Sequence, residues 1–231
     1  SGILDWFSVS MDNVFTLYGS WDYIFAQLQQ LVVNRGLITH LIIHTPDQSS
    51  IPVSHPVLLP NVQFVHLRTY HPVDLLHFTF PSSVIHLGLE VPADAKASSV
   101  EAESKALSRS SNNWTTIESI SFSLPVSGTI LLEFTRILAP KALRVRFVLQ
   151  VNATSAYAEQ VVTAFGQVGS NGCLGGPLTW SIAPKCKYLE VRLGQVISKN
   201  RLLHDAMVSH ARITETIRKS QGKEFRINIT F

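Results

Sequence analysis

A short apolar pattern recurs along the chain. In each copy an aliphatic or aromatic residue is followed by a second one three positions later and by a third after two more. Successive copies begin 24, 22, 33, 25 and 44 residues apart. The copies are Ile38/Leu41/Ile43, Val62/Val65/Leu67, Val84/Leu87/Leu89 and Ile117/Ile120/Phe122, with weaker ones at Ala142/Val145/Phe147 and Cys186/Leu189/Val191. Because residues two apart point to the same face of a strand, the pattern predicts parallel strands that together bury one apolar face.

The intervals between these copies predict helices that return the chain to the next strand. Residues 20–34 carry apolar side chains at helical spacing behind a capping serine. Residues 155–168 and 200–220 each have one apolar face, and residues 93–109 predict an exposed helix or a loop. The alternation of residues 225–231 predicts a last strand.

We therefore predict one α/β domain, an irregular leucine-rich-repeat-like solenoid with parallel strands and intervening helices. Residues 1–36 would form a helical N-terminal cap, residues 37–193 the repeat-like strands, and residues 194–231 a C-terminal helix and strand. The 44-residue interval is twice 22, which leaves room for one more degenerate repeat near residues 160–170. The alternative architecture is a β-sandwich of the jelly-roll type, whose strands are antiparallel.

Three segments carry a family resemblance. Residues 37–43 (LITHLII), 59–68 (LPNVQFVHLR) and 184–193 (PKCKYLEVRL) resemble the irregular leucine-rich repeats of F-box proteins, especially the expanded fungal kind. The resemblance covers residues 37–193 and implies the substrate-recognition region of an F-box-type ubiquitin ligase receptor. The asparagine that this family carries three residues after the last apolar position is absent, and no F-box is recognisable in the first 35 residues. The resemblance therefore implies a twisted, irregular stack.

Composition and charge narrow the class of protein. Hydrophobic residues make up 45% of the 231 residues and charged residues 15%, which favours a packed core over disorder. The formal net charge is +3, but the basic residues are scattered, which argues against nucleic-acid binding. The chain contains no run of about 18 apolar residues, so the sequence does not predict a membrane span. With only Cys173 and Cys186, the chain has no disulfide framework, and we expect a cytoplasmic or nuclear protein.

The residues that alternate with the buried ones predict a binding surface. His40, His66 and His86 each precede an inward-pointing residue, so they should face away from the core, where they could stack as a column. No cysteine or carboxylate accompanies them at ligand spacing, so we predict neither a metal nor a cofactor. Our first hypothesis is a non-enzymatic module that binds a protein partner through His40, Ile42, His66, Arg68 and His86.

Two other functions are compatible with the sequence. A β-rich chain with few charges suits a viral capsid or other structural protein released from a polyprotein. The glycine-rich stretch around Cys173 faintly resembles the Gly-x-Cys-Gly-Gly loop of chymotrypsin-like viral cysteine proteases, which would make the chain a cysteine hydrolase. Leu174 interrupts that motif, and neither a Gly-x-Ser-x-Gly elbow nor a phosphate loop is present. We therefore predict no catalytic residues.

Overall fold

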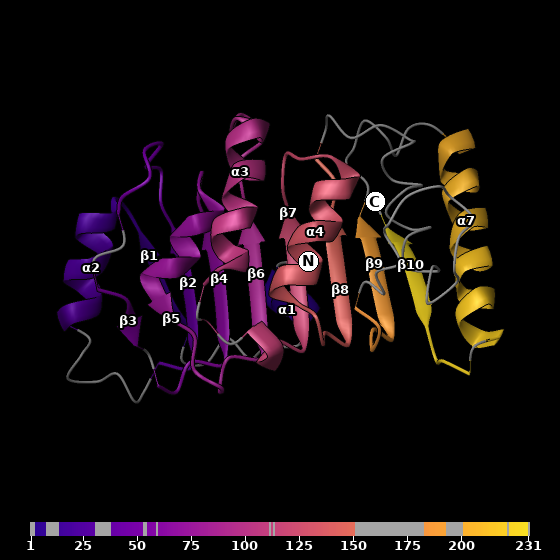
Figure 1. Ribbon diagram of the computed structural model, residues 1–231, viewed down its shortest axis with the longest axis horizontal. Coiled ribbons are helices and arrows are strands. Elements are labelled where there is room, and N and C mark those ends of the chain that lie inside the picture. Colours follow the sequence, from indigo (N-terminus) through magenta and orange to yellow (C-terminus); the bar gives the residue numbers. More distant parts are fainter. Residues whose placement is uncertain are drawn as a thin grey trace.

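Eight parallel strands in chain order form the main sheet (Figure 1). The computed structural model describes residues 3–7, 14–30, 38–52, 55–58, 60–110, 112, 114–150, 183–192, 201–220 and 222–230. The strands of the main sheet are β1 (Val14–Tyr18), β2 (His40–His44), β4 (Phe64–Arg68), β6 (His86–Glu90), β7 (Ser119–Ser123), β8 (Arg144–Val148), β9 (Tyr188–Arg192) and β10 (Arg226–Thr230). A separate parallel pair joins β3 (Val57–Leu58) to β5 (Phe78–Thr79).

The longer helices lie on one side of this sheet (Figure 1). They are α2 (Trp21–Gln30), α3 (Ala97–Ser108), α4 (Gly128–Leu138) and, beside the β10 end, α7 (Arg201–Ser220), and two 3-10 helices add Pro72–His77 and Trp114–Thr116. The short helix α1 (Ile3–Phe7) lies against the other face, where Phe7 packs on Phe64 of β4. No helix in the described ranges is long and apolar enough to cross a membrane.

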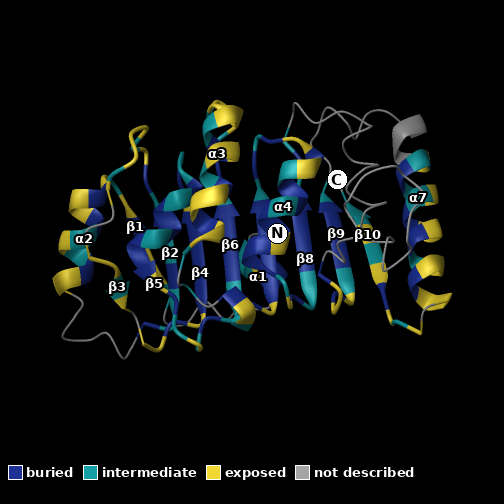
Figure 2. Ribbon diagram, in the orientation of Figure 1, coloured by how far each residue is buried: buried dark blue, intermediate teal, exposed yellow. Residues whose placement is uncertain are grey.

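The strand register aligns the apolar pattern across the whole sheet. One row of inward-pointing side chains is Phe15, Leu41, Val65, Leu87, Ile120, Val145, Leu189 and Ile227. The next is Leu17, Ile43, Leu67, Leu89, Phe122, Phe147, Val191 and Ile229. Most of these side chains are buried beneath the helices and belong to one hydrophobic cluster (Figure 2). Burial of this continuous apolar surface is the main stabilising contribution.

The predicted α/β class with parallel strands is confirmed. All six copies of the pattern coincide with strands of the sheet, and the alternating tail forms β10. The alternative jelly roll is wrong, because every strand pairing in the described residues is parallel. The function as a viral capsid or other structural protein stays a prediction.

Helix ends follow local signals. The hydroxyl oxygen of Ser20 accepts a 3.4 Å hydrogen bond from the backbone N–H of Tyr23, as the predicted serine cap requires. Ser127 caps α4 in the same way, accepting from the backbone N–H of Ile130. The segment predicted as helix or loop at 93–109 contains α3, whereas α4 was not predicted. After α7 the chain turns at Gly222, whose φ of +72° favours glycine.

One expectation needs correction. The segment 1–36, expected to be a helical cap, also contains β1, whose copy of the pattern is incomplete because its first position holds Asp12. The extra degenerate repeat expected near residues 160–170 lies outside the described residues; the strands on either side of it in the chain, β8 and β9, pair directly. The helix predicted at 155–168 lies outside the described residues.

Candidate interaction surface

The side chains that point away from the main core form three rows, which we call the outward face. The first row is Val14, His40, Phe64, His86, Ser119, Arg144, Tyr188 and Arg226. The second is Thr16, Ile42, His66, Gly88, Ser121, Arg146, Glu190 and Asn228. The third is Tyr18, His44, Arg68, Glu90, Ser123, Val148, Arg192 and Thr230. All five residues proposed from the sequence for partner binding lie on this face.

The expected histidine column does not form. His40 and His86 share the first row, with Phe64 between them, whereas His66 lies in the second row between Ile42 and Gly88. The reason is that His40 and His86 precede the second position of the apolar pattern and His66 precedes the third. His66 is also not solvent-facing, since only 6% of it is exposed. The histidines therefore alternate between two rows.

A charged cluster lies where β4 and β6 end. Glu90 lies between two partners: its Oε2 is 3.6 Å from His66 Nε2 and its Oε1 is 3.5 Å from Arg68 Nε. The interaction with His66 and the nearby positive charge of Arg68 lower the pKa of Glu90, although burial opposes this. The Arg68 side chain is 49% exposed, against 35% for Glu90 and 8% for His66, so it is the member of the cluster most accessible to a partner.

Gly88 makes room for this cluster. A Cβ atom at that position would lie 2.3 Å from His66 Nδ1, far closer than nonbonded atoms approach. The ring of His66 can therefore lie over β6 only because residue 88 has no side chain. In the described residues His66 Nδ1 is buried without a hydrogen-bond partner.

The histidines around this cluster are uncharged near neutral pH. Burial lowers the pKa of His86 to about 4, and the positive charges of Arg144 and His40 act in the same direction. Burial also lowers the pKa of His44, whose ring centroid lies 5.9 Å from that of His66. As neutral imidazoles, these residues offer one donor and one acceptor each.

The other end of the outward face is rich in arginine. Across the described strands the face holds five arginines and two glutamates, an excess of three positive charges that equals the formal net charge of the whole chain. The glutamates are Glu90 and Glu190, and the arginines are Arg68, Arg144, Arg146, Arg192 and Arg226. Since the planar guanidinium group binds carboxylates in a bidentate fashion, this surface is complementary to acidic groups.

An ion pair is buried within this arginine-rich half. Arg146 Nε lies 3.8 Å from Glu190 Oε1, and the same carboxylate oxygen accepts a 3.1 Å hydrogen bond from the Thr230 hydroxyl. Arg146 is only 4% exposed, and burial lowers its pKa. This pair could not be predicted from the sequence, because its two members are 44 residues apart and are brought together only by the register of β8 and β9.

Helix α1 covers the middle of the outward face. The Phe7 ring centroid lies 5.0 Å from that of Phe64 and 5.5 Å from that of His86. The guanidinium carbon of Arg144 lies 4.8 Å from the centre of the Trp6 ring, and Arg144 Nη2 donates a 2.9 Å hydrogen bond to the Trp6 carbonyl. The face is therefore partly occupied by the chain itself, which the sequence did not indicate.

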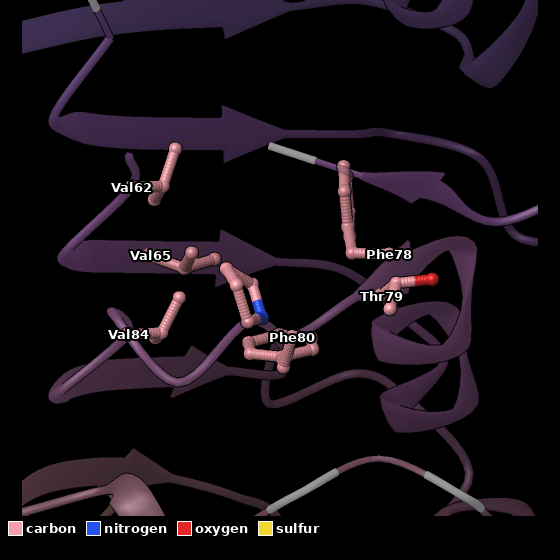
Figure 3. Close-up of a pocket in the computed structure, with 7 residues that line it drawn as sticks. Val62, Val65, Phe78, Thr79, Phe80 and Val84 are labelled. Atoms are coloured by element: carbon pink, nitrogen blue, oxygen red, sulfur yellow. The ribbon is translucent and has the colours of Figure 1, made fainter. Parts of the chain in front are cut away.

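The described residues contain no group of three histidine, cysteine or acidic side chains that could hold a metal ion. Burial raises the pKa of the Cys186 thiol to about 12, so this cysteine is not a thiolate at neutral pH. Cys173 lies outside the described residues, and the cysteine hydrolase stays a prediction. A shallow recess near β4 and β5 has almost entirely apolar walls and offers no reactive group (Figure 3); it is lined by Val62, Val65, Phe78, Thr79, Phe80, Pro81 and Val84.

Comparisons with protein families, with curated proteins and with solved structures found no match to this chain. The outward face is therefore interpreted from its own chemistry.

Proposed function

We propose that this chain is a non-enzymatic protein-interaction module, an irregular leucine-rich-repeat-like solenoid that binds a protein partner on its outward face. The observation that carries the proposal is the asymmetry of the sheet. Its inner face is covered by long helices, whereas the outward face bears charged and polar rows over which, among the described residues, only the five of α1 lie. A more specific form of the proposal is the substrate-recognition region of an F-box-type ubiquitin ligase receptor.

The order of the strands supports the solenoid part of the proposal. Each strand of the main sheet pairs with the next strand of that sheet along the chain, always in parallel. In repeat architectures each unit contacts its neighbours in the same sequential way, and the strands line one continuous binding surface.

The proposed binding residues divide into those that reach a partner and those that hold them in place. Arg68 is half exposed and lies in the third row, whose described side chains are all exposed or half-buried. His66 is buried and interacts with Glu90, which in turn pairs with Arg68. Arg68 therefore contacts the partner directly, while His66 fixes the geometry of the cluster. His40, Ile42 and His86 are half-buried and extend the surface toward α1.

A paired substitution tests the proposal. His66→Ala combined with Arg68→Ala removes the cluster, and Lys105→Ala serves as the matched control because Lys105 is exposed on α3, on the helical side. Proteins captured from extracts of the source cells are quantified for each variant, with circular dichroism and thermal melting as checks of folding. We expect the double variant to fold and to lose capture by at least about tenfold, or ~1.4 kcal/mol, while the control keeps it. Unchanged capture by the double variant would show that the surface is wrongly assigned.

A further inference from the structure

We propose that α1 is a displaceable occupant of the outward face, and that the partner binds where α1 lies through a short acidic segment with two adjacent aromatic side chains. The inference rests on the proposed function and specifies the partner for the same surface. It goes beyond the residues proposed from the sequence, because it adds Phe64, Arg144 and Arg146 to His86 and centres the binding site beneath α1.

Helix α1 is not part of the main core. Trp6 and Phe7 form a separate small cluster with Phe64, flanked by Ile3, Leu4 and Ile42. The helix has five residues, so its own backbone hydrogen bonds stabilise it weakly, and it depends on the surface beneath it. The main hydrophobic cluster includes none of these residues, so the sheet and its helices remain packed when α1 leaves.

The surface under α1 fits aromatic side chains. Phe64 is fully buried beneath Phe7, with the two rings nearly perpendicular at 70°. The Arg144 guanidinium lies between two rings, 4.8 Å from the centre of Trp6 and 5.7 Å from the centre of Tyr188. Such cation–π and edge-to-face contacts favour a ligand that presents two neighbouring aromatic groups.

The fit of α1 is nevertheless incomplete. Trp6 Nε1, His86 Nδ1 and Arg146 Nε are all buried without a hydrogen-bond partner in the described part of the chain. Two of these, the indole N–H and the guanidinium N–H, can only donate, and Arg146 is 4% exposed. Arg146 Nε lies 3.8 Å from Glu190 Oε1, which is longer than a hydrogen bond, so a partner carboxylate placed beside Arg146 would supply the acceptor that neither Glu190 nor α1 supplies. The excess of arginine on this face favours the same acidic group.

These contacts predict competition between α1 and the partner. When a segment of the chain occupies the binding site, another ligand can bind only to those molecules whose site is free. The apparent affinity is therefore the intrinsic affinity multiplied by the fraction of molecules with a free site. Substitutions that weaken α1 packing should therefore strengthen partner binding, whereas substitutions in the surface beneath it should weaken binding.

The probe for this competition is a fluorescein-labelled peptide with the sequence of residues 1–12, which contains both aromatic residues and two aspartates. Its binding is followed by fluorescence anisotropy with the full chain carrying Trp6→Ala and Phe7→Ala, and with the unaltered full chain. We expect the double variant to bind the peptide at least tenfold more tightly than the unaltered chain. Adding Arg146→Gln to the double variant should reduce the affinity at least tenfold, whereas adding Lys105→Ala should not change it.

Two outcomes would overturn the inference: no binding of the peptide to the double variant, or equal binding to both chains. A peptide whose tryptophan and phenylalanine are replaced by alanine must also fail to bind. If the double variant folds poorly, Trp6→Ala alone removes the cation–π contacts but leaves Phe7 packed, and a smaller gain in affinity is expected. If the peptide assay fails but partner capture still depends on His66 and Arg68, only the role of α1 is rejected. If the peptide assay fails and capture does not depend on these residues either, the proposed function is rejected as well.

Discussion

The two faces of the sheet differ because one alternating pattern places apolar core residues on the inner face and polar or charged residues on the outward face. Leu67 and Arg68 are adjacent on β4, yet Leu67 lies in the main hydrophobic cluster and Arg68 is half exposed on the outward face. Because the strands are parallel and in register, each residue type extends into a row across its neighbours. The inner rows exclude water and stabilise the fold, while the outer rows can vary in charge without disturbing the core.

The largest expected effect comes from the inner rows. Leu67→Ala should lower the free energy of unfolding by about 2–5 kcal/mol, because it removes buried methyl groups and leaves a cavity. Arg68→Ala, one residue away, should lower it by less than about 1 kcal/mol, since the side chain is half exposed and screened by solvent. Urea denaturation of both variants measures the difference. Similar losses for the two residues would show that the faces do not differ as described.

The second prediction concerns polar atoms on the core side. Asp74 is 1% exposed, and its Oδ2 accepts a 3.1 Å hydrogen bond from Trp21 Nε1 and another from the Thr69 hydroxyl. Asp74→Ala leaves both donors buried without an acceptor and should cost about 2–4 kcal/mol in the free energy of unfolding. The exposed Asp94, which accepts a hydrogen bond from the Tyr70 hydroxyl, is the control, and Asp94→Ala should have little effect. If Asp74→Ala is as mild as Asp94→Ala, this network does not hold α2 to the loop after β4.

The third prediction is a pH dependence on the outward face. The pKa of His86 is about 4 in the folded chain and close to 6.5 when unfolded, so the unfolded state binds more protons between these values. Neutral His86 therefore makes its full contribution to the free energy of unfolding above pH 6.5, and this contribution is lost as the pH falls toward 4. Allowing for its partial exposure, the loss should be about 1–2 kcal/mol. Urea denaturation should show that the free energy of unfolding declines less between pH 7 and pH 4.5 for His86→Gln than for the unaltered chain. An identical decline for the two chains would contradict the burial of this ring.

His71 provides an internal comparison for that titration. Burial lowers its pKa, but its hydrogen bonds to the Gln48 carbonyl and to Glu103, together with nearby negative charges, outweigh this and raise it. The contribution of protonated His71 to the free energy of unfolding is thus present below pH 6.5 and is lost as the pH rises through its raised folded-state pKa. His71→Gln should therefore change stability in the opposite pH direction from His86→Gln.

The smallest effect is expected at Gly88. Gly88→Ala places a methyl group against the His66 ring and should lower the free energy of unfolding by about 1 kcal/mol as the ring moves. Partner capture should fall at the same time, because the contact between His66 and Glu90 is disturbed. Lys105→Ala, on the helical side, is the control. An unchanged thermal melt and unchanged capture for Gly88→Ala would mean that the His66 position is unimportant.

The sequence predicted the strands because their signal is local. Residues two apart reveal which side chains share a face, so the inward rows and the outward position of Arg68 followed from the pattern. Strand β1 was missed because Asp12 interrupts the pattern, and α4 was missed although Ser127 supplied a cap signal. Local spacing also could not show in which row each histidine lies.

The composition of the candidate surface was harder to predict. The Arg146–Glu190 pair depends on register between strands that are distant in sequence. The packing of Trp6 and Phe7 on Arg144 and Phe64 joins segments up to 138 residues apart, and no periodicity indicates it. Such contacts are set by tertiary packing, which overrides local preference.

The central claim, that a partner binds the outward face, can be tested most directly by site-specific photo-cross-linking. A photoreactive amino acid replaces Tyr18 in one chain and Lys105 on the helical side in another, and each is irradiated in extracts of the source cells. Tyr18 is 69% exposed in the third row of the outward face and lies outside the cluster of His66, Arg68 and Glu90, so its replacement leaves that cluster intact. We predict a discrete cross-linked adduct from position 18 and none from position 105. An adduct from position 105 alone would place the interaction on the helical side and contradict this claim.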